Sequence, residues 1–150
     1  NEFYELALSN HLRLIEENGY RYGFRKNPAS CANEYGDHLL ATHAAPEKIE
    51  KQYRLAMDSL MQMSRTPEMF NLEQSGLAMG YYRLGLVCLR AGKTKAAEEH
   101  FRHCAVLREK AYREVTESLV EGSSLDAVLS ERISWLLAQA RLAQLPQQDF

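Results

Sequence analysis

The 150-residue sequence lacks the features that most catalytic and membrane classes require. It contains three cysteines, four prolines and a single tryptophan. No apolar run approaches the roughly 18 residues of a membrane span, so we expect none. The sequence has no glycine-rich phosphate loop, no nucleophile elbow, and no serine with an obvious histidine partner. We therefore expect no catalysis and no cofactor.

The sequence also has no large excess of charge of either sign. The formal net charge is −2 and the isoelectric point is near 6.2. A domain that binds nucleic acid usually carries a basic field, so we expect no nucleic-acid partner. Cys31, Cys88 and Cys104 have no disulfide-framework spacing, which favours reduced thiols and a cytoplasmic setting.

The chain begins with Asn1 in the segment NEFYELALSN, without an initiating methionine or a basic leader. This beginning is typical of a piece cut from a longer protein. We therefore expect a module of a larger polypeptide, and we expect the full-length protein to cover the free flank of the first helix.

The stretch from Ala78 to Arg108 shows the clearest pattern. Two apolar stripes of helical spacing flank the Ala91–Lys93 break. The first stripe comprises Tyr81, Leu84, Gly85 and Cys88, and the second comprises Ala97, Phe101, Cys104 and Ala105. Two amphipathic helices joined by so short a turn must pack antiparallel, and Gly85 indicates a close helix crossing.

The same arrangement recurs along the chain. An aromatic residue followed three positions later by a small one occurs at Tyr4, Tyr53 and Phe101, with spacings of 49 and 48 residues. A small residue in mid-helix recurs at Gly36, Gly85 and Ser134, with a spacing of 49. Two markers with one period predict repeated helical hairpins, which generally bury a core by stacking into a solenoid.

The pattern resembles the tetratricopeptide repeat family. The match consists of Tyr81, Leu84, Gly85, Cys88, Ala97, Phe101 and Cys104, in order and spacing. Cys88 replaces the usual aromatic residue, Glu109 replaces the usual closing proline, and the period is about 15 residues longer than normal. The resemblance implies an all-α, right-handed solenoid of a long-period variant that serves as a protein-binding scaffold.

Cap and stop residues place the elements. We expect one domain over residues 1–150, with a half hairpin at 1–19, repeats at 28–64 and 67–121, and a half hairpin at 124–145. Residues 20–27 form a connector, a bend near Gly76 or Gly80 interrupts the fourth helix, and all four prolines lie at breaks. The last helix carries apolar residues at Val128, Leu129, Ile133, Leu136, Leu137 and Ala140.

The resemblance also supplies candidate binding residues, because in that family the first helix of each hairpin lines the concave face. Carried over to this sequence, the candidates are Asn33, Glu34, Asp37, Tyr82, Arg83, Leu86, Arg90, Glu131, Arg132 and Trp135. Tyr82 and Trp135 are anchor-type residues, and Arg83 with Arg90 is suited to a carboxylate or phosphate. Alternatively, Glu34 and Asp37 neutralise the two arginines.

Two other groups of residues could form a site. His100 and His103 lie on neighbouring turns and could hold a metal with a third ligand, but Phe101 and Cys104 occupy the buried stripe. We therefore expect no metal. Arg21, Arg25 and Lys26 alternate with aromatic residues and could contact an anion, although solvated basic residues are commoner in such loops.

The function expected from the sequence is non-catalytic binding of a partner peptide or segment on the concave helical face. The alternative is a homo-oligomerisation module, a homodimer for example, within a larger bacterial signalling protein, formed where apolar end flanks meet across a symmetric interface. A third hypothesis is a small enzyme or ligand sensor that uses the Tyr20–Lys26 segment with the histidines.

Overall fold

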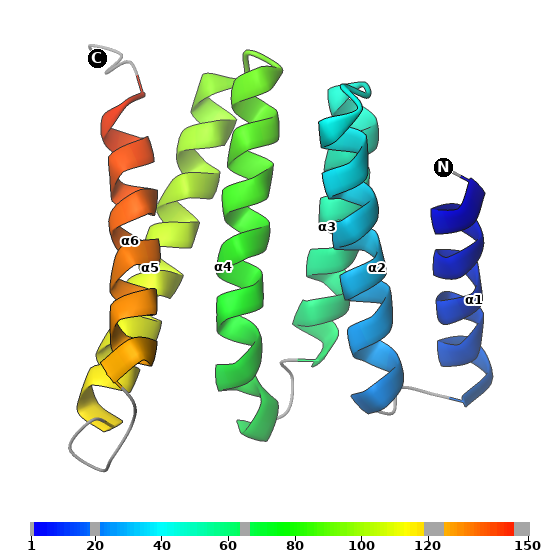
Figure 1. Cartoon of the computed structure of the whole chain (residues 1–150), viewed down its shortest axis with the longest axis horizontal. Coiled ribbons are helices and arrows are strands. Elements are labelled where there is room, and N and C mark those ends of the chain that lie inside the picture. The colour runs from blue at the N-terminus through cyan, green and yellow to red at the C-terminus, as the bar shows by residue number, and fades with distance from the viewer. Residues whose placement is uncertain (1, 19–21, 64–66, 119–124, 146–150) are drawn as a thin grey trace. The chain divides into compact units, whose positions relative to one another are not determined.

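A computed structural model describes residues 2–18, 22–63, 67–118 and 125–145. In these ranges the chain is all-α, as predicted, and contains no strand (Figure 1). The helices are α1 (Glu2–Asn18), α2 (Tyr22–Ala41), α3 (Pro46–Met63), α4 (Pro67–Arg90), α5 (Thr94–Ser118) and α6 (Leu125–Ala143). None of these helices combines the length and the apolar character needed to cross a bilayer.

Two compact units divide the chain between Gly76 and Leu77, inside α4. The first unit holds α1, α2, α3 and the beginning of α4, and the second holds the rest of α4 with α5 and α6. Helix α4 continues through Gly76 and Gly80, so the interruption expected there is absent. The expected extension of α5 to residue 121 lies partly outside the described residues.

The start of α2 corrects one prediction. Residues 22–27 are helical rather than a connector, and Pro28 lies inside the helix instead of beginning it. Pro28 is the seventh residue of α2, beyond the four amides at a helix start that have no partner within the helix, so its ring removes the backbone hydrogen bond to the Phe24 carbonyl. Pro28 is fully buried, and burial of its ring offsets part of the cost. Pro46 and Pro67 begin helices as predicted.

The turn between α2 and α3 is a Schellman motif. The His43 amide donates to the Leu40 carbonyl at 3.2 Å, and the Ala44 amide donates to the Leu39 carbonyl at 2.9 Å. His43 adopts the left-handed conformation, with φ of 56°. These two bonds satisfy carbonyls that the end of α2 would otherwise leave unpaired, so they end the helix and turn the chain back into α3.

The turn between α4 and α5 repeats this motif bond for bond. The Gly92 amide donates to the Leu89 carbonyl at 3.0 Å, and the Lys93 amide donates to the Cys88 carbonyl at 2.8 Å. Gly92 has φ of 73°, in the same left-handed region. Each atom pair lies 49 residues after its counterpart in the first turn, so the predicted period is present in the hydrogen bonds.

The two hairpins also share their central contact. A methyl group built on Gly36 would lie 2.4 Å from Cε1 of Tyr53, and one built on Gly85 would lie 2.6 Å from Cε1 of Phe101. Both rings are completely buried. In each hairpin, therefore, a glycine of the first helix admits an aromatic ring of the second, as the close crossing inferred for Gly85 requires.

One residue distinguishes the two hairpins. The connection between α2 and α3 spans residues 42–45, whereas that between α4 and α5 spans residues 91–93. The insertion lies wholly in the turn, because Pro46 precedes Tyr53 by the same seven residues that separate Thr94 from Phe101. This difference explains why Gly36 and Gly85 are 49 residues apart whereas Tyr53 and Phe101 are 48 apart.

Candidate functional site

In the first unit, the candidate residues on α2 contact neighbouring helices or their own helix. The carboxylate of Asp37 accepts a hydrogen bond from the Tyr53 hydroxyl at 2.7 Å. Glu34 accepts one from Ser30, one turn earlier on the same helix, at 3.2 Å. Asn33 is half-buried, and its Oδ1 has no hydrogen-bond partner among the described residues. Glu34 and Asp37 remain exposed to solvent.

Helix α1 covers the side of α2 that bears Tyr35. The Tyr4 and Tyr35 rings stack with centroids 5.2 Å apart, and the Tyr35 hydroxyl donates to Glu5 at 2.8 Å. Burial raises the pKa of Tyr35, and the hydrogen bond to Glu5 and the charge of that carboxylate raise it further. The phenol is therefore a protonated donor at neutral pH and ties α1 to α2.

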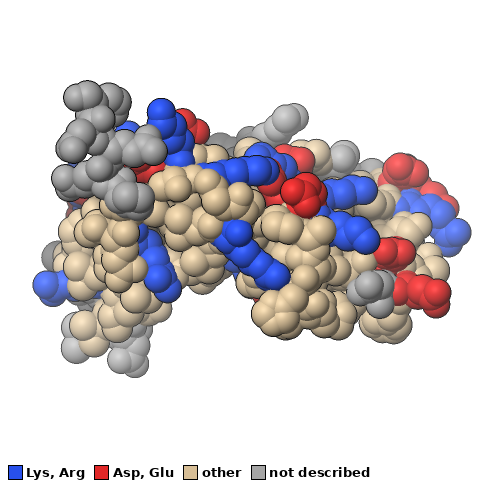
Figure 2. Space-filling view, turned by 90° about the horizontal axis from the view of Figure 1, so that it is seen from above, with Lys and Arg blue, Asp and Glu red and all other residues tan. Residues whose placement is uncertain are grey.

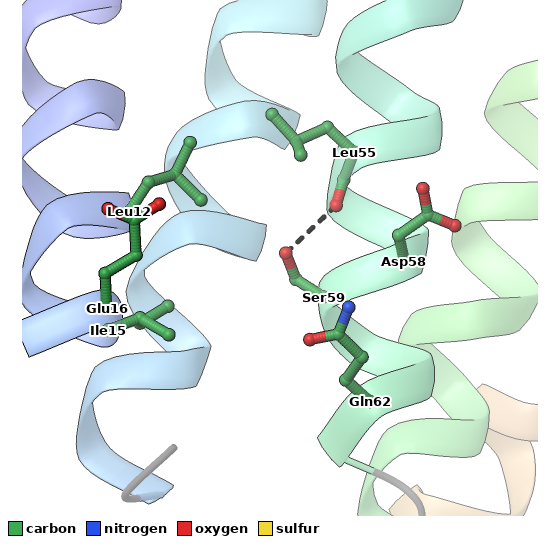
Figure 3. Close-up of a pocket in the computed structure, with 7 residues that line it drawn as sticks. All are labelled: Leu12, Ile15, Glu16, Leu55, Asp58, Ser59 and Gln62. Carbon is green, nitrogen blue, oxygen red and sulfur yellow. Dashed lines mark hydrogen bonds between the residues drawn. The ribbon is translucent and has the colours of Figure 1, made fainter. Parts of the chain in front are cut away.

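A cleft of about 170 Å³ opens between α1 and α3 (Figure 3). Its walls combine aliphatic groups with two carboxylates, and they comprise Leu12, Ile15, Glu16, Leu55, Asp58, Ser59 and Gln62. The Ser59 hydroxyl donates to the Leu55 carbonyl at 3.0 Å, so this donor is already engaged by its own helix (Figure 3). The cleft is smaller than an ordinary small-molecule site, and it fits no more than one side chain of a ligand.

A second hollow lies between α1 and α2 and contains His11, Cys31 and Glu34. The pKa of the Cys31 thiol is raised by burial and then by the charge of Glu34, so the thiol is protonated at neutral pH. A nucleophilic cysteine needs the opposite shift. This cluster is therefore unsuited to thiol catalysis, although it combines a cysteine with a histidine and a carboxylate.

In the second unit, one face of α4 carries apolar and basic side chains at helical spacing. Met79, Arg83, Leu86 and Arg90 follow one another three or four residues apart. Met79 and Arg90 are exposed, whereas Arg83 and Leu86 are half-buried. Arg83, Leu86 and Arg90 belong to the candidate set, so the structure brings these three together along one stripe.

Tyr82 lies beside that stripe, in contact with two helices. Its ring packs against Phe101 of α5, with centroids 5.7 Å apart, and its hydroxyl accepts a hydrogen bond from Arg141 of α6 at 3.5 Å. The long bond contributes little, but the ring packs against the buried clusters of this unit. Tyr82 therefore joins α4 to α5 and α6.

Two of the three candidates on α6 are turned toward α5. Glu131 accepts hydrogen bonds from Nη1 of Arg108 at 2.9 and 3.2 Å, and Arg108 is buried. The Trp135 ring stacks on Tyr112 with centroids 6.3 Å apart, and its buried Nε1 has no hydrogen-bond acceptor among the described residues. Only Arg132 is exposed. The structure thus places Glu131 and Trp135 in the packing between helices rather than on an open face.

The histidine pair weighed as a metal site packs against an aromatic ring. His100 and His103 lie beside Tyr81, with ring centroids at 6.0 and 5.0 Å. Among the described residues, no cluster of three or more potential ligands could hold a metal ion. Burial raises the pKa of the nearby Cys104 thiol, although Arg108 opposes the shift. The anion contact considered at Arg21, Arg25 and Lys26 lies outside the side chains that the structure describes.

Charged side chains of both signs occur on the face that Figure 2 shows. Figure 2 shows lysine and arginine side chains among acidic ones on the face in view, without a continuous basic field. The described ion pairs on single helices, such as Arg54 with Glu50 and Arg102 with Glu98, are of the exposed i, i+4 kind. Such pairs contribute little stability and no binding site.

Comparison with known proteins gives no assignment, because no family model, no curated protein and no solved structure matches this chain. The resemblance to tetratricopeptide repeats therefore stays a prediction.

Proposed function

We propose that this chain is a non-catalytic protein-interaction scaffold, in which repeated helical hairpins stack as a right-handed solenoid and present a face that binds a partner peptide. The observation that supports the proposal is the duplicated hairpin. Each of the two copies has a Schellman turn and a glycine that contacts an aromatic ring of the facing helix. Repeats of this kind need neighbours to bury their faces, and stacked arrays of them create extended binding surfaces.

The stripe on α4 is the proposed centre of the binding face. Met79 and Leu86 offer apolar surface, and Arg83 and Arg90 lie on either side of Leu86 along the helix. Arginine makes paired hydrogen bonds to carboxylates, so the stripe suits a peptide in which an acidic residue stands next to an apolar one. Asn33, Glu34 and Asp37 on α2, and Arg132 on α6, remain separate candidates for contacts with a partner.

Selection from a displayed peptide library tests this proposal. We expect the chain to enrich acidic and apolar peptides, and we expect Arg83→Glu and Arg90→Glu each to weaken their binding about tenfold or more, which corresponds to about 1.4 kcal/mol. Arg102→Glu is the matched control, because Arg102 is an exposed arginine on α5 outside the stripe. Its binding should equal that of the wild-type chain.

Circular dichroism would verify that each variant keeps its helices. The proposal fails if no peptide is enriched over an unrelated helical protein, or if Arg83→Glu and Arg102→Glu bind the selected peptides equally well.

A further inference from the structure

Helix α6 has two apolar sides, and α4 and α5 cover only one of them. The covered side carries Glu131, Trp135 and Ala138, and Ala138 packs in a buried cluster with residues of both neighbouring helices. The opposite side is a stripe of aliphatic residues, Leu129, Ile133, Leu136 and Leu137, that are 45%, 57%, 50% and 56% exposed. A helix that is apolar on both sides normally has a partner on each.

Helix α2 shows what such a second side does. Its Cys31, Tyr35 and His38 face α1, with the same four-then-three spacing by which Glu131, Trp135 and Ala138 face their neighbours. The next position after Tyr35, Gly36, receives the Tyr53 ring from α3. On α6 the position after Trp135 is Leu136, which is 50% exposed, whereas the 49-residue spacing of the sequence puts Ser134 in the place of Gly36. The stripe on α6 therefore corresponds to the side of α2 that α3 covers.

A helix of the α3 type does not fit this stripe. At Gly36 even a methyl group would overlap the Tyr53 ring, and Leu136, in the position after Trp135, adds a whole isobutyl group. The occupant must therefore meet leucine and isoleucine with aliphatic side chains rather than with an inserted ring. Leu129, Ile133, Leu136 and Ala140 follow at intervals of four, three and four, the spacing of a coiled-coil seam.

The seam is complementary to itself. If two copies of α6 pack antiparallel with Ile133 opposite Leu136 of the other copy, Leu129 lies opposite Ala140, so a large side chain meets a small one at each end. The eight residues from Ile133 to Ala140 carry no charge, so no like charges oppose one another at the centre. Self-complementarity of this kind is what a two-fold interface requires.

The exposed area indicates how strong the contact is. Four aliphatic side chains that are about half exposed give an apolar patch of roughly 400 Å² per copy, the size of the largest apolar patch on a typical monomer, which is often functional. Two such patches bury roughly 800 Å² before any polar rim is added, which is below the roughly 1,200 Å² of stable specific interfaces and in the range of weak, transient ones. We propose that this stripe docks a second copy of the chain through an antiparallel, two-fold α6 pair of micromolar strength.

Sedimentation velocity over a range of concentrations tests the proposal. We expect the wild-type chain to pass from monomer to dimer in the micromolar range, and we expect Leu136→Glu to weaken dimerisation at least a hundredfold. Leu6→Glu is the matched control, because Leu6 is an aliphatic residue of α1 with 63% exposure and should leave the dimer unchanged. Both substitutions place a charge at an exposed position, so both variants should keep native circular dichroism.

Disulfide formation tests the register. A mixture of Ile133→Cys and Leu136→Cys chains should cross-link several-fold faster than either variant alone, and the wild-type chain, with its three native thiols, provides the background.

A concentration-independent monomer overturns the proposal. So does a chain-like assembly that Leu6→Glu abolishes, because it would show that α1 covers α6. Faster cross-linking of each variant with itself would overturn the antiparallel register. The proposed peptide-binding face is centred on α4, so the peptide-binding proposal can fail independently.

Discussion

Gly36 and Gly85 set the distance between the paired helices of their hairpins. Alanine is a better helix former than glycine by about 1 kcal/mol, so propensity alone favours alanine at both positions. The structure gives the opposing term, because the new methyl group would lie 2.4 to 2.6 Å from a buried ring. The sequence predicted a close helix crossing at Gly85, because glycine is unfavourable inside a helix without such a reason. The contact with Phe101 confirms this prediction.

We predict that Gly36→Ala and Gly85→Ala each lower the free energy of unfolding by about 2 kcal/mol, because overpacking of a core outweighs the gain in helix propensity. Urea denaturation measures the loss. The penalty at Gly36 should shrink in a Tyr53→Leu background, since the smaller side chain makes room for the methyl group.

Gly92→Ala is the control for backbone strain without crowding. A methyl group there meets no atom within 4 Å, and φ of 73° costs a non-glycine residue about 1 kcal/mol. If Gly36→Ala were to stabilise the chain, as propensity alone predicts, the close contact with Tyr53 would be refuted.

Helix α6 is attached to the second unit by a buried ion pair as well as by apolar packing. The Arg108 side chain is 6% exposed and that of Glu131 is 18% exposed, and they meet at 2.9 Å. The resemblance to tetratricopeptide repeats placed Glu131 on an open concave face, whereas in the structure this carboxylate pairs with Arg108 of α5. Arg108 could not be identified as its partner, because the two residues are 23 positions apart on different helices.

We predict that Glu131→Gln lowers the free energy of unfolding by about 3 kcal/mol, because it leaves the Arg108 charge buried without its counter-charge. The matched control is Glu98→Gln. It breaks the exposed pair with Arg102 on α5, and its effect should stay within about 0.5 kcal/mol. Equal, small losses for the two variants in urea denaturation would show that the Arg108–Glu131 pair does not hold α6 in place.

The chain as a whole is built around a hairpin that occurs twice. Its period was predictable, because aromatic and small residues in mid-helix depend on a close crossing that every copy needs. The start of α2 was not predictable from the rule that prolines mark breaks, since Pro28 lies inside this helix, as its seventh residue. The side of α6 that remains exposed was not predictable either. Leu136 and Trp135 are both apolar, and only the packing of the helices shows which of them is covered.

Equivalence of the two hairpins implies that their turns are interchangeable. The turn at residues 42–45 has one residue more than the turn at 91–93, and both end the preceding helix with the same pair of hydrogen bonds. Replacement of Thr42–Ala45 by the Ala-Gly-Lys sequence of the second turn should therefore leave Tyr53 seated on Gly36. It also replaces His43, whose φ is 56°, with glycine, which adopts this conformation without strain.

The most direct measurement is the free energy of unfolding of this turn exchange. We predict a value within about 1 kcal/mol of the wild-type chain, or higher because glycine relieves the left-handed residue. Deletion of Lys51 is the control. It also shortens the chain by one residue, but within α3, where it rotates Ile49 by about 100° relative to Tyr53 and should cost several kcal/mol. A loss for the turn exchange as large as that for the Lys51 deletion would contradict the claim that the two hairpins are copies of one structure.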